Sequence, residues 1–264
     1  MALTIGDYLL VQSGRDVTKT CMDVSNMVVS KPVIAQENGT KQLLRVSATA
    51  DWSSQAAQLQ FYTVSDEGKK LADIAKCILK FSGRDSWIKK WKRNEYLIKT
   101  RIEKLQTGVN DGQSHKIKRG MAYRLFGALV DYEQKYRGME EVIMDSAAFE
   151  ATARVKLQAT DDHGSFYFPP FWIDSLGHLS GFVMNANDTV DPSQAFTNHG
   201  WDSMRCTTKF SVEKTYQTYV KMQNIGGTTY SGDIYILEEG SIVAVFGGNT
   251  VSLQAPLKSV DQTC

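Results

Sequence analysis

The sequence lacks both a charge imbalance and a long apolar run. Its 264 residues carry 30 basic and 29 acidic side chains, so the formal net charge is only +1. A balanced charge creates no global field that would attract a nucleic acid or an anionic membrane, and we expect neither partner. The apolar runs are too short to cross a bilayer. A secretory signal has a basic segment followed by an apolar core, and residues 1–8 do not show this pattern. We therefore expect a cytoplasmic protein.

Cysteine and histidine are also scarce, with four of each. The cysteines are widely separated and form neither a CxxC pair nor a zinc-type spacing, so we expect no metal site. Free thiols in a reducing compartment are the simplest interpretation, since a catalytic cysteine needs a nearby base that the sequence does not reveal. His115 and His163 lie in polar, glycine-containing turns and are expected to be solvated. The cysteines are Cys21, Cys77, Cys206 and Cys264.

The residues that are abundant are those of a globular protein. Hydrophobic residues make up 42% of the chain and charged residues 22%, which is typical of a folded protein with a buried core. The length allows one large domain or two of ordinary size.

One helix followed by strands is predicted for the first third of the chain. Residues 1–12 place Leu3, Ile5 and Leu9 on or near one side of a helix, and Gly14 ends it. Alternating stretches separated by turn signals then predict an antiparallel meander, and a helix on a curved sheet is an α+β layer. The predicted strands are residues 21–35, 42–52, 57–64 and 71–81.

Residues 86–106 interleave basic side chains with aromatic ones, a mixture that can bind nucleic acid. At helical spacing, however, Trp87, Trp91 and Ile98 can pack inward while the lysines stay hydrated, as in an amphipathic connecting helix. The neutral overall charge favours the connecting helix. The polar, glycine-containing residues 107–116 then predict a surface linker.

The second half repeats the arrangement of the first without repeating its sequence. Residues 119–136 predict a packed helix and residues 139–157 a return to strands. Strands around a single helix in each half predict a double hotdog of α+β class, with two antiparallel sheets each wrapped on a central helix. The expected units are 1–85 (first hotdog), 86–118 (helical connector and linker) and 119–264 (second hotdog). The later strands are expected at residues 205–212, 215–223, 230–237 and 241–246.

Residues 168–183 put a carboxylate and an imidazole inside an otherwise apolar run. Pro169 and Pro170 forbid a helix before them, so we expect one to begin just after them, with Asp174 in or before its first turn. A spacing of four residues then places Asp174 and His178 on one face of this helix. An acid and a base in an apolar wall are what proton-transfer chemistry requires. The alternative is structural: Asp174 caps the start of the helix and His178 is its hydrogen-bond partner.

The motif Phe-Trp-Ile-Asp-Ser-Leu-Gly-His-Leu-Ser-Gly-Phe-Val-Met-Asn, at residues 171–185, resembles the product template domain of fungal non-reducing polyketide synthases. Further matches are Met-Ala-Leu-Thr-Ile-Gly-Asp-Tyr-Leu at residues 1–9, Lys-Pro-Val at residues 31–33, and Gly200-Trp201. The resemblance thus covers nearly the whole chain. It implies a dehydratase-like double hotdog that directs aldol cyclisation and aromatisation of poly-β-keto chains.

The resemblance assigns a role to Asp174 and leaves a second role open. In the family, the matching Asp works with a His of the first hotdog, which stands upstream of the motif at residues 1–9. The sequence begins inside that motif, so we expect a shortened, stand-alone protein whose first hotdog is incomplete. His178 stands where the family has Gln or His. It is therefore either the orienting neighbour of Asp174 or the replacement for the family's His.

The resemblance implies a cofactor-free enzyme of fungal polyketide biosynthesis, a lyase or isomerase that cyclises, dehydrates or isomerises an aromatic polyketide. The alternatives are a non-catalytic protein that binds or delivers a polyketide, and a purely structural subunit. An acyl carrier protein is a further partner, and we expect a homodimer because unpaired sheet edges invite pairing. Asp174 and His178 are the expected catalytic residues. The expected substrate-binding residues are Phe171, Trp172, Phe182, Asn187, His199, Trp201 and Tyr8.

Overall fold

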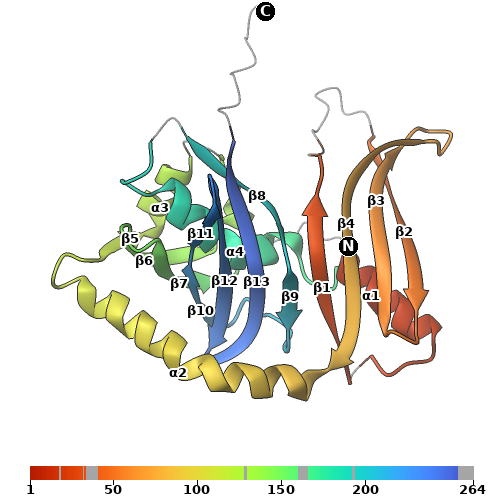
Figure 1. The fold of residues 1–264 in the computed structure, drawn as a ribbon, viewed down its shortest axis with the longest axis horizontal. Helices are drawn as coiled ribbons and strands as arrows, with labels where there is room; N and C mark the ends of the chain where they lie inside the picture. Colours follow the sequence, from red (N-terminus) through yellow and green to blue (C-terminus); the bar gives the residue numbers. More distant parts are fainter. Residues whose placement is uncertain are drawn as a thin grey trace, which may run out of the picture.

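The N-terminal half is one helix lying against a four-stranded antiparallel sheet (Figure 1). The computed structural model describes residues 1–17, 19–31, 33, 41–127, 130–159, 166–191 and 194–254. Successive side chains of a strand point to opposite faces of the sheet, so one face carries Leu59, Phe61 and Leu79. These residues belong to the same hydrophobic core as Leu10 of the helix. The elements are α1 (Ala2–Gln12), β1 (Thr20–Val29), β2 (Leu43–Asp51), β3 (Ala56–Val64) and β4 (Lys70–Gly83), with β1 beside β4, β4 beside β3, and β3 beside β2.

The C-terminal half surrounds its central helix, α4 (Pro170–Asn185), with a larger antiparallel sheet. Proline is tolerated in the first turn because the amide it lacks has no partner there. Leu176, Leu179 and Phe182 of α4 are fully buried against the strands. These strands are β5 (His115–Lys118), β6 (Met139–Asp145), β7 (Glu150–Lys156), β8 (Ala195–Trp201), β9 (Ser203–Cys206), β10 (Thr215–Lys221), β11 (Gln223–Gly226), β12 (Thr229–Glu238) and β13 (Ser241–Gln254). The expected double hotdog is confirmed.

The two halves share one sheet, where two sheets were expected. Its order is β2-β3-β4-β1-β8-β13-β12-β10-β7-β6-β5, so β1 and β8 join the halves. At this junction Val28 lies opposite Gly200. A Cβ at Gly200 would lie 1.9 Å from the carbonyl oxygen of Met27, and the φ of Gly200 is +147°. Only glycine therefore allows the strands to approach so closely.

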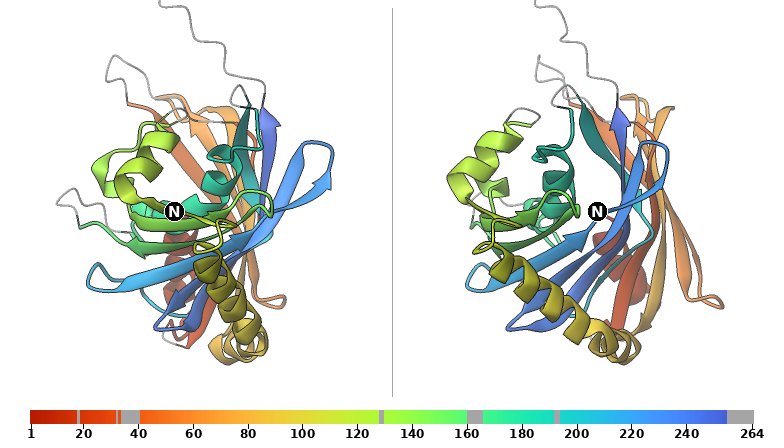
Figure 2. Two further views of the ribbon diagram at one scale, coloured as in Figure 1. Left: turned by 90° about the vertical axis from the view of Figure 1, so that its left-hand side faces the viewer. Right: turned by 60° about the vertical axis from the view of Figure 1, so that its left-hand side comes forward.

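The predicted connecting helix is confirmed as α2 (Arg84–Gly108), which crosses the outer face of the C-terminal part of the sheet (Figure 2). Trp87, Trp91 and Ile98 form a second core with residues of β10, β12 and β13. The guanidinium of Arg101 donates two hydrogen bonds to the buried carboxylate of Glu150, which ties the helix to β7. The predicted linker of residues 107–116 was wrong at its end, because His115 begins strand β5.

Other predicted boundaries also need correction. The helix expected over residues 119–136 ends early, since α3 covers Arg119–Phe126 and the short 3₁₀ helix η1 covers Gln134–Tyr136. Strand β1 ends at Val29, and residues 32, 34 and 35 of the predicted strand lie outside the described part. Strand β8 was missed, and the strand expected over residues 205–212 ends at Cys206. Within the described residues, no helix is both long and apolar enough to span a membrane.

Candidate active site

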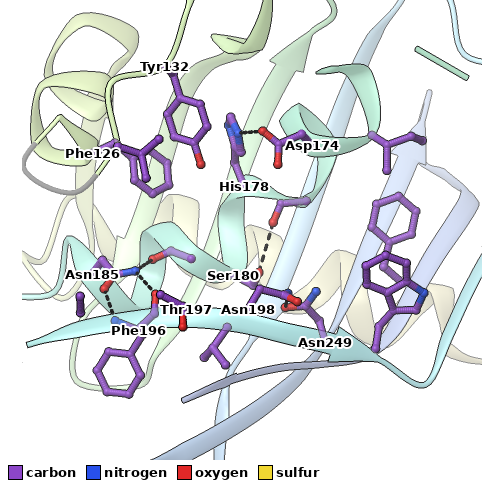
Figure 3. A pocket seen from close by; sticks show the side chains of 18 of the residues that line it. Phe126, Tyr132, Asp174, His178, Ser180, Asn185, Phe196, Thr197, Asn198 and Asn249 are labelled. Atoms are coloured by element: carbon purple, nitrogen blue, oxygen red, sulfur yellow. Dashed lines mark hydrogen bonds and ion pairs between the residues drawn. The ribbon is translucent and has the colours of Figure 1, made fainter. Parts of the chain in front are cut away.

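One face of α4 lines a cavity of about 930 Å³ whose other walls come from α3, β8, β9 and β13 (Figure 3). The lining positions on α4 include Asp174, Gly177, His178, Gly181 and Asn185, a spacing that places them on a single helical face. The two glycines leave room beside the helix. A Cβ at Gly177 would meet no heavy atom within 4 Å, and one at Gly181 would meet only a carbon of Phe126, at 4.0 Å.

Asp174 and His178 are hydrogen-bonded, as their spacing predicted. The distance from His178 Nε2 to Asp174 Oδ2 is 2.7 Å. The side chain of Asp174 is 44% exposed, whereas that of His178 is 2% exposed. The rings of Tyr132 and Phe126 cover His178, with centroid distances of 4.4 Å and 5.6 Å. The carboxylate therefore reaches the cavity, and the imidazole lies behind it.

The second imidazole nitrogen meets a buried phenol. His178 Nδ1 lies 3.3 Å from Tyr123 Oη, which also accepts a hydrogen bond from the Met139 amide at 3.0 Å. Burial raises the pKa of Tyr123 well above its usual range, so the phenol stays protonated and acts as a donor. The phenol proton faces two acceptors at 3.3 Å, His178 Nδ1 and the Tyr136 carbonyl oxygen. The contacts fit an imidazole whose Nε2–H donates to Asp174 while its unprotonated Nδ1 faces the phenol.

Asn185 fastens the cavity-lining helix to the strand opposite it. Its Nδ2 donates to the carbonyl oxygens of Gly181 and Phe196, each at 3.0 Å. Its Oδ1 accepts from the Phe196 amide at 2.8 Å. All of its hydrogen-bonding groups are thus engaged with the backbone, so Asn185 sets the spacing between α4 and β8 at this end of the cavity.

Of the residues expected to bind substrate, only Trp201 lines the cavity. Its indole donates to the Val24 carbonyl at 3.0 Å, so the ring spans the junction between the two halves. Phe182, in contrast, is fully buried, because 3.6 residues per turn place it roughly 80° from Asp174, toward the core. Tyr8 is 60% exposed on α1 and does not line the cavity.

The other expected substrate-binding residues have structural contacts outside the cavity. Phe171 is buried beside Tyr136, and the indole of Trp172 donates to the Gln158 carbonyl at 2.9 Å. Asn187 is buried and donates to the Ser146 carbonyl at 2.9 Å. His199 Nε2 lies 2.5 Å from the hydroxyl of Ser252 on β13. These residues were proposed because they are aromatic or polar and close to the motif, and that proximity does not decide which face they occupy.

The cavity also has lining residues that the sequence did not single out. Phe126 comes from α3 and Tyr132 precedes η1, while Asn198 and Asn249 come from β8 and β13. No cluster of three or more His, Cys, Asp or Glu side chains suited to a metal occurs among the described residues.

Comparison with known proteins identifies similar sequences. A family model described as the polyketide synthase dehydratase N-terminal domain matches residues 106–252. A non-reducing polyketide synthase of Byssochlamys spectabilis is 53% identical over 94% of the chain, and the conidial pigment polyketide synthase alb1 of Aspergillus fumigatus is 46% identical over 100% of it. The chain spans 11% of the length of the first relative and 12% of the second.

Solved structures share the fold at low sequence identity. The dehydratase domain from the CurJ module of the curacin polyketide synthase has a TM-score of 0.69 and 16% identity, covering 97% of this chain and 82% of that one. The dehydratase domain of PpsC from Mycobacterium tuberculosis has a TM-score of 0.69 and 14% identity, covering 94% of this chain and 80% of that one. The dehydratase-like architecture is thus independently supported.

Proposed function

Because the chain belongs to the polyketide synthase dehydratase family, we propose that it acts on an aromatic polyketide intermediate, with Asp174 as the proton-transferring group. One observation carries this proposal: a carboxylate stands at the open side of a cavity of about 930 Å³, held by an imidazole that is itself buried. A cavity of this size, with aromatic and aliphatic walls, suits a flat apolar ligand that carries a few polar groups.

The proposed reaction needs no cofactor. Asp174, as a carboxylate, takes a proton from a methylene that lies between two carbonyl groups, and the electron pair of the broken C–H bond forms an enolate. The enolate carbon attacks a carbonyl carbon further along the chain, so a C–C bond forms and the carbonyl π electrons move to its oxygen. Asp174 returns the proton to that oxygen and gives an alcohol. Loss of hydroxide and an α-proton, together one water, then extends conjugation toward an aromatic ring.

In this proposal His178 is a positioning residue, not a second base. Both imidazole nitrogens are engaged, Nε2 with Asp174 and Nδ1 with Tyr123, and the side chain is only 2% exposed. A group so enclosed has no free nitrogen to offer a substrate. Of the two roles that the sequence left open, the orienting neighbour is therefore the one we assign.

The test combines three variants with a carrier-bound poly-β-ketone as substrate and chromatographic analysis of its products. We expect Asp174→Asn to lower the rate of the directed cyclisation about 100-fold or more, leaving spontaneous products. His178→Gln retains a donor toward Asp174 and should keep most of the rate. His178→Leu lacks that donor and should lose about tenfold in kcat, with KM little changed. A wild-type product distribution from Asp174→Asn, in a variant that remains folded, would overturn the proposal.

A non-catalytic binding role is the second candidate, and one observation favours it. Asp174 is the only carboxylate among the described residues that line the cavity, so no second acidic group is available there. If Asp174→Asn and His178→Leu both leave the product distribution unchanged while a polyketide still binds, the protein shields or delivers its ligand without transforming it.

We also propose that the substrate arrives on an acyl carrier protein and that the chain acts as a cytoplasmic homodimer. Strands β2 and β5 stand at the two ends of the main strand order, and the side chains of β2 are exposed along most of its length. Such edges favour pairing with another copy. A monomeric mass by light scattering would count against the dimer.

A further inference from the structure

Two side-chain amides form a relay from the backbone to the cavity wall that faces α4. The Gly200 amide donates to Asn198 Oδ1 at 2.8 Å. Asn198 Nδ2 donates to Asn249 Oδ1 at 3.0 Å. Figure 3 shows both asparagines on the strand side of the cavity, apart from Asp174 and His178 on the helix.

These hydrogen bonds determine the positions of the oxygen atom and the NH₂ group in each side-chain amide. A backbone N–H can only donate, so the Asn198 atom that it meets must be the oxygen, and the other terminal atom of Asn198 must be the NH₂ group. That NH₂ group in turn requires an acceptor, so the Asn249 atom facing it is the oxygen. The NH₂ group of Asn249 is thereby left facing away from Asn198.

The NH₂ group of Asn249 is held in position without an acceptor among the described residues. Asn249 is 6% exposed and lines the cavity, and its Nδ2 has no hydrogen-bond partner among the described residues. The Nδ2 atom is not one of the fully enclosed polar atoms without a partner, so it stays accessible from the cavity, where a ligand that brings an acceptor can bind it. The hydroxyl of Ser180, which lines the same cavity, differs because its proton is directed to the Gly177 carbonyl at 3.2 Å.

We propose that Asn249 binds a carbonyl or enolate oxygen of the ligand and so selects ketones over equally flat hydrocarbons. The inference rests on the proposed function, since it names the ligand chemistry of the same cavity. The strand wall then supplies a donor to an oxygen, and the helix wall supplies the carboxylate acceptor of Asp174. A β-polyketone, in which carbonyl groups alternate with acidic methylenes, offers a matching group to each wall.

The test is an equilibrium binding measurement that needs no turnover. The probes are 1-tetralone, a bicyclic aryl ketone, and tetralin, the same bicycle without the oxygen, titrated by calorimetry. We expect the folded wild-type protein to bind 1-tetralone about tenfold more tightly than tetralin. Asn249→Leu, which is similar in size, should abolish this preference without weakening tetralin binding. Ser180→Ala, a polar deletion in the same cavity, should leave the preference intact.

A second variant reverses the polarity of the relay. Asn198→Asp keeps an oxygen for the Gly200 amide but presents an acceptor to Asn249, which must then turn its NH₂ group away from the cavity and its oxygen toward it. Ketone preference should disappear, and 1-tetralol, which can donate, should bind more tightly than 1-tetralone. Unchanged ketone preference in Asn249→Leu or in Asn198→Asp would overturn the inference.

The outcome is separable from that of the proposed reaction. Asp174→Asn leaves the relay untouched, so it should bind 1-tetralone with the wild-type preference even if turnover is lost. If the preference fails in the wild type while Asp174→Asn still loses turnover, only the role of Asn249 is refuted. If the preference holds while Asp174→Asn retains turnover, only the role of Asp174 is refuted.

Discussion

The substitution Tyr123→Phe removes the phenol oxygen beside His178 Nδ1. It tests whether this buried contact keeps His178 in place against Asp174. In Tyr123→Phe the ring remains, so apolar burial and the contacts with Phe126 are preserved. The Oη atom is lost, and with it the acceptor of the Met139 amide at 3.0 Å. The phenol proton that faces His178 Nδ1 and the Tyr136 carbonyl oxygen, each at 3.3 Å, is lost as well. The change is thus confined to hydrogen bonds.

The magnitude follows from what is left without a partner. Met139 is 0% exposed, so no water can replace the lost acceptor, and a buried unsatisfied amide costs about 1–3 kcal/mol. The longer contact to His178 adds about 0.5 kcal/mol. We therefore expect the free energy of unfolding to fall by about 1.5–3.5 kcal/mol and the Tm by roughly 5–10 °C. Because His178 is then free to tilt away from Asp174, turnover should also fall about tenfold.

Tyr132 provides the matched control. Its ring lies closer to His178, at a centroid distance of 4.4 Å, yet its hydroxyl makes no hydrogen bond with the described part of the chain. Tyr132→Phe should therefore change the unfolding free energy by less than about 0.5 kcal/mol in the same urea titration. Equal stability of the two variants would refute the role assigned to the Tyr123 hydroxyl.

Three further predictions concern the helix, the junction and a buried ion pair. Gly177→Ala should stabilise the protein by about 0.5–1 kcal/mol in urea unfolding, and Gly177→Phe should block 1-tetralone binding in calorimetry without unfolding the chain, because its side chain enters open space. Gly200→Ala should lower the unfolding free energy by about 3 kcal/mol, since its Cβ would overlap Met27; a loss below about 1 kcal/mol would contradict the close junction. Burial acts to raise the pKa of Glu150, but its bonds to Arg101 and Tyr219 prevail and hold it below 4.5. This carboxylate thus contributes stability above about pH 4.5 that is lost as the pH falls through its folded pKa. In Glu150→Gln, the Tm measured by thermal scans should therefore fall less steeply as the pH is lowered below about 4.5.

The sequence identified the helix of the site because the necessary information is local. Two prolines set where α4 begins, and a separation of four residues is enough to bring Asp174 and His178 together on it. Helix α2 was predicted for the same reason, since its apolar positions recur at helical spacing. Elements whose character comes from contacts within a few residues can be derived from the chain alone.

The partners of the site could not be derived in this way. Tyr123 and His178 are 55 residues apart, and Asn198 and Asn249 are 51 apart. Their meeting depends on how α3 packs against α4 and on the register between β8 and β13, and no local pattern encodes either. Strand β8 itself was missed, so Asn198 had no assigned face. The available signal was the pair of glycines on the helical face of Asp174, which marked the side where space is left.

The cavity persists because its walls are fixed independently of what fills it. Two glycines on α4 leave a gap that packed side chains would otherwise tend to close, since protein interiors are close-packed. Asn185 holds α4 to β8 through two hydrogen bonds to the Phe196 backbone. The contact between Tyr123 and His178 links α4 to α3 on another side. With both walls fastened, the Asp174 carboxylate and the Asn249 amide remain on opposing surfaces, so a ligand between them meets an acceptor on one side and a donor on the other.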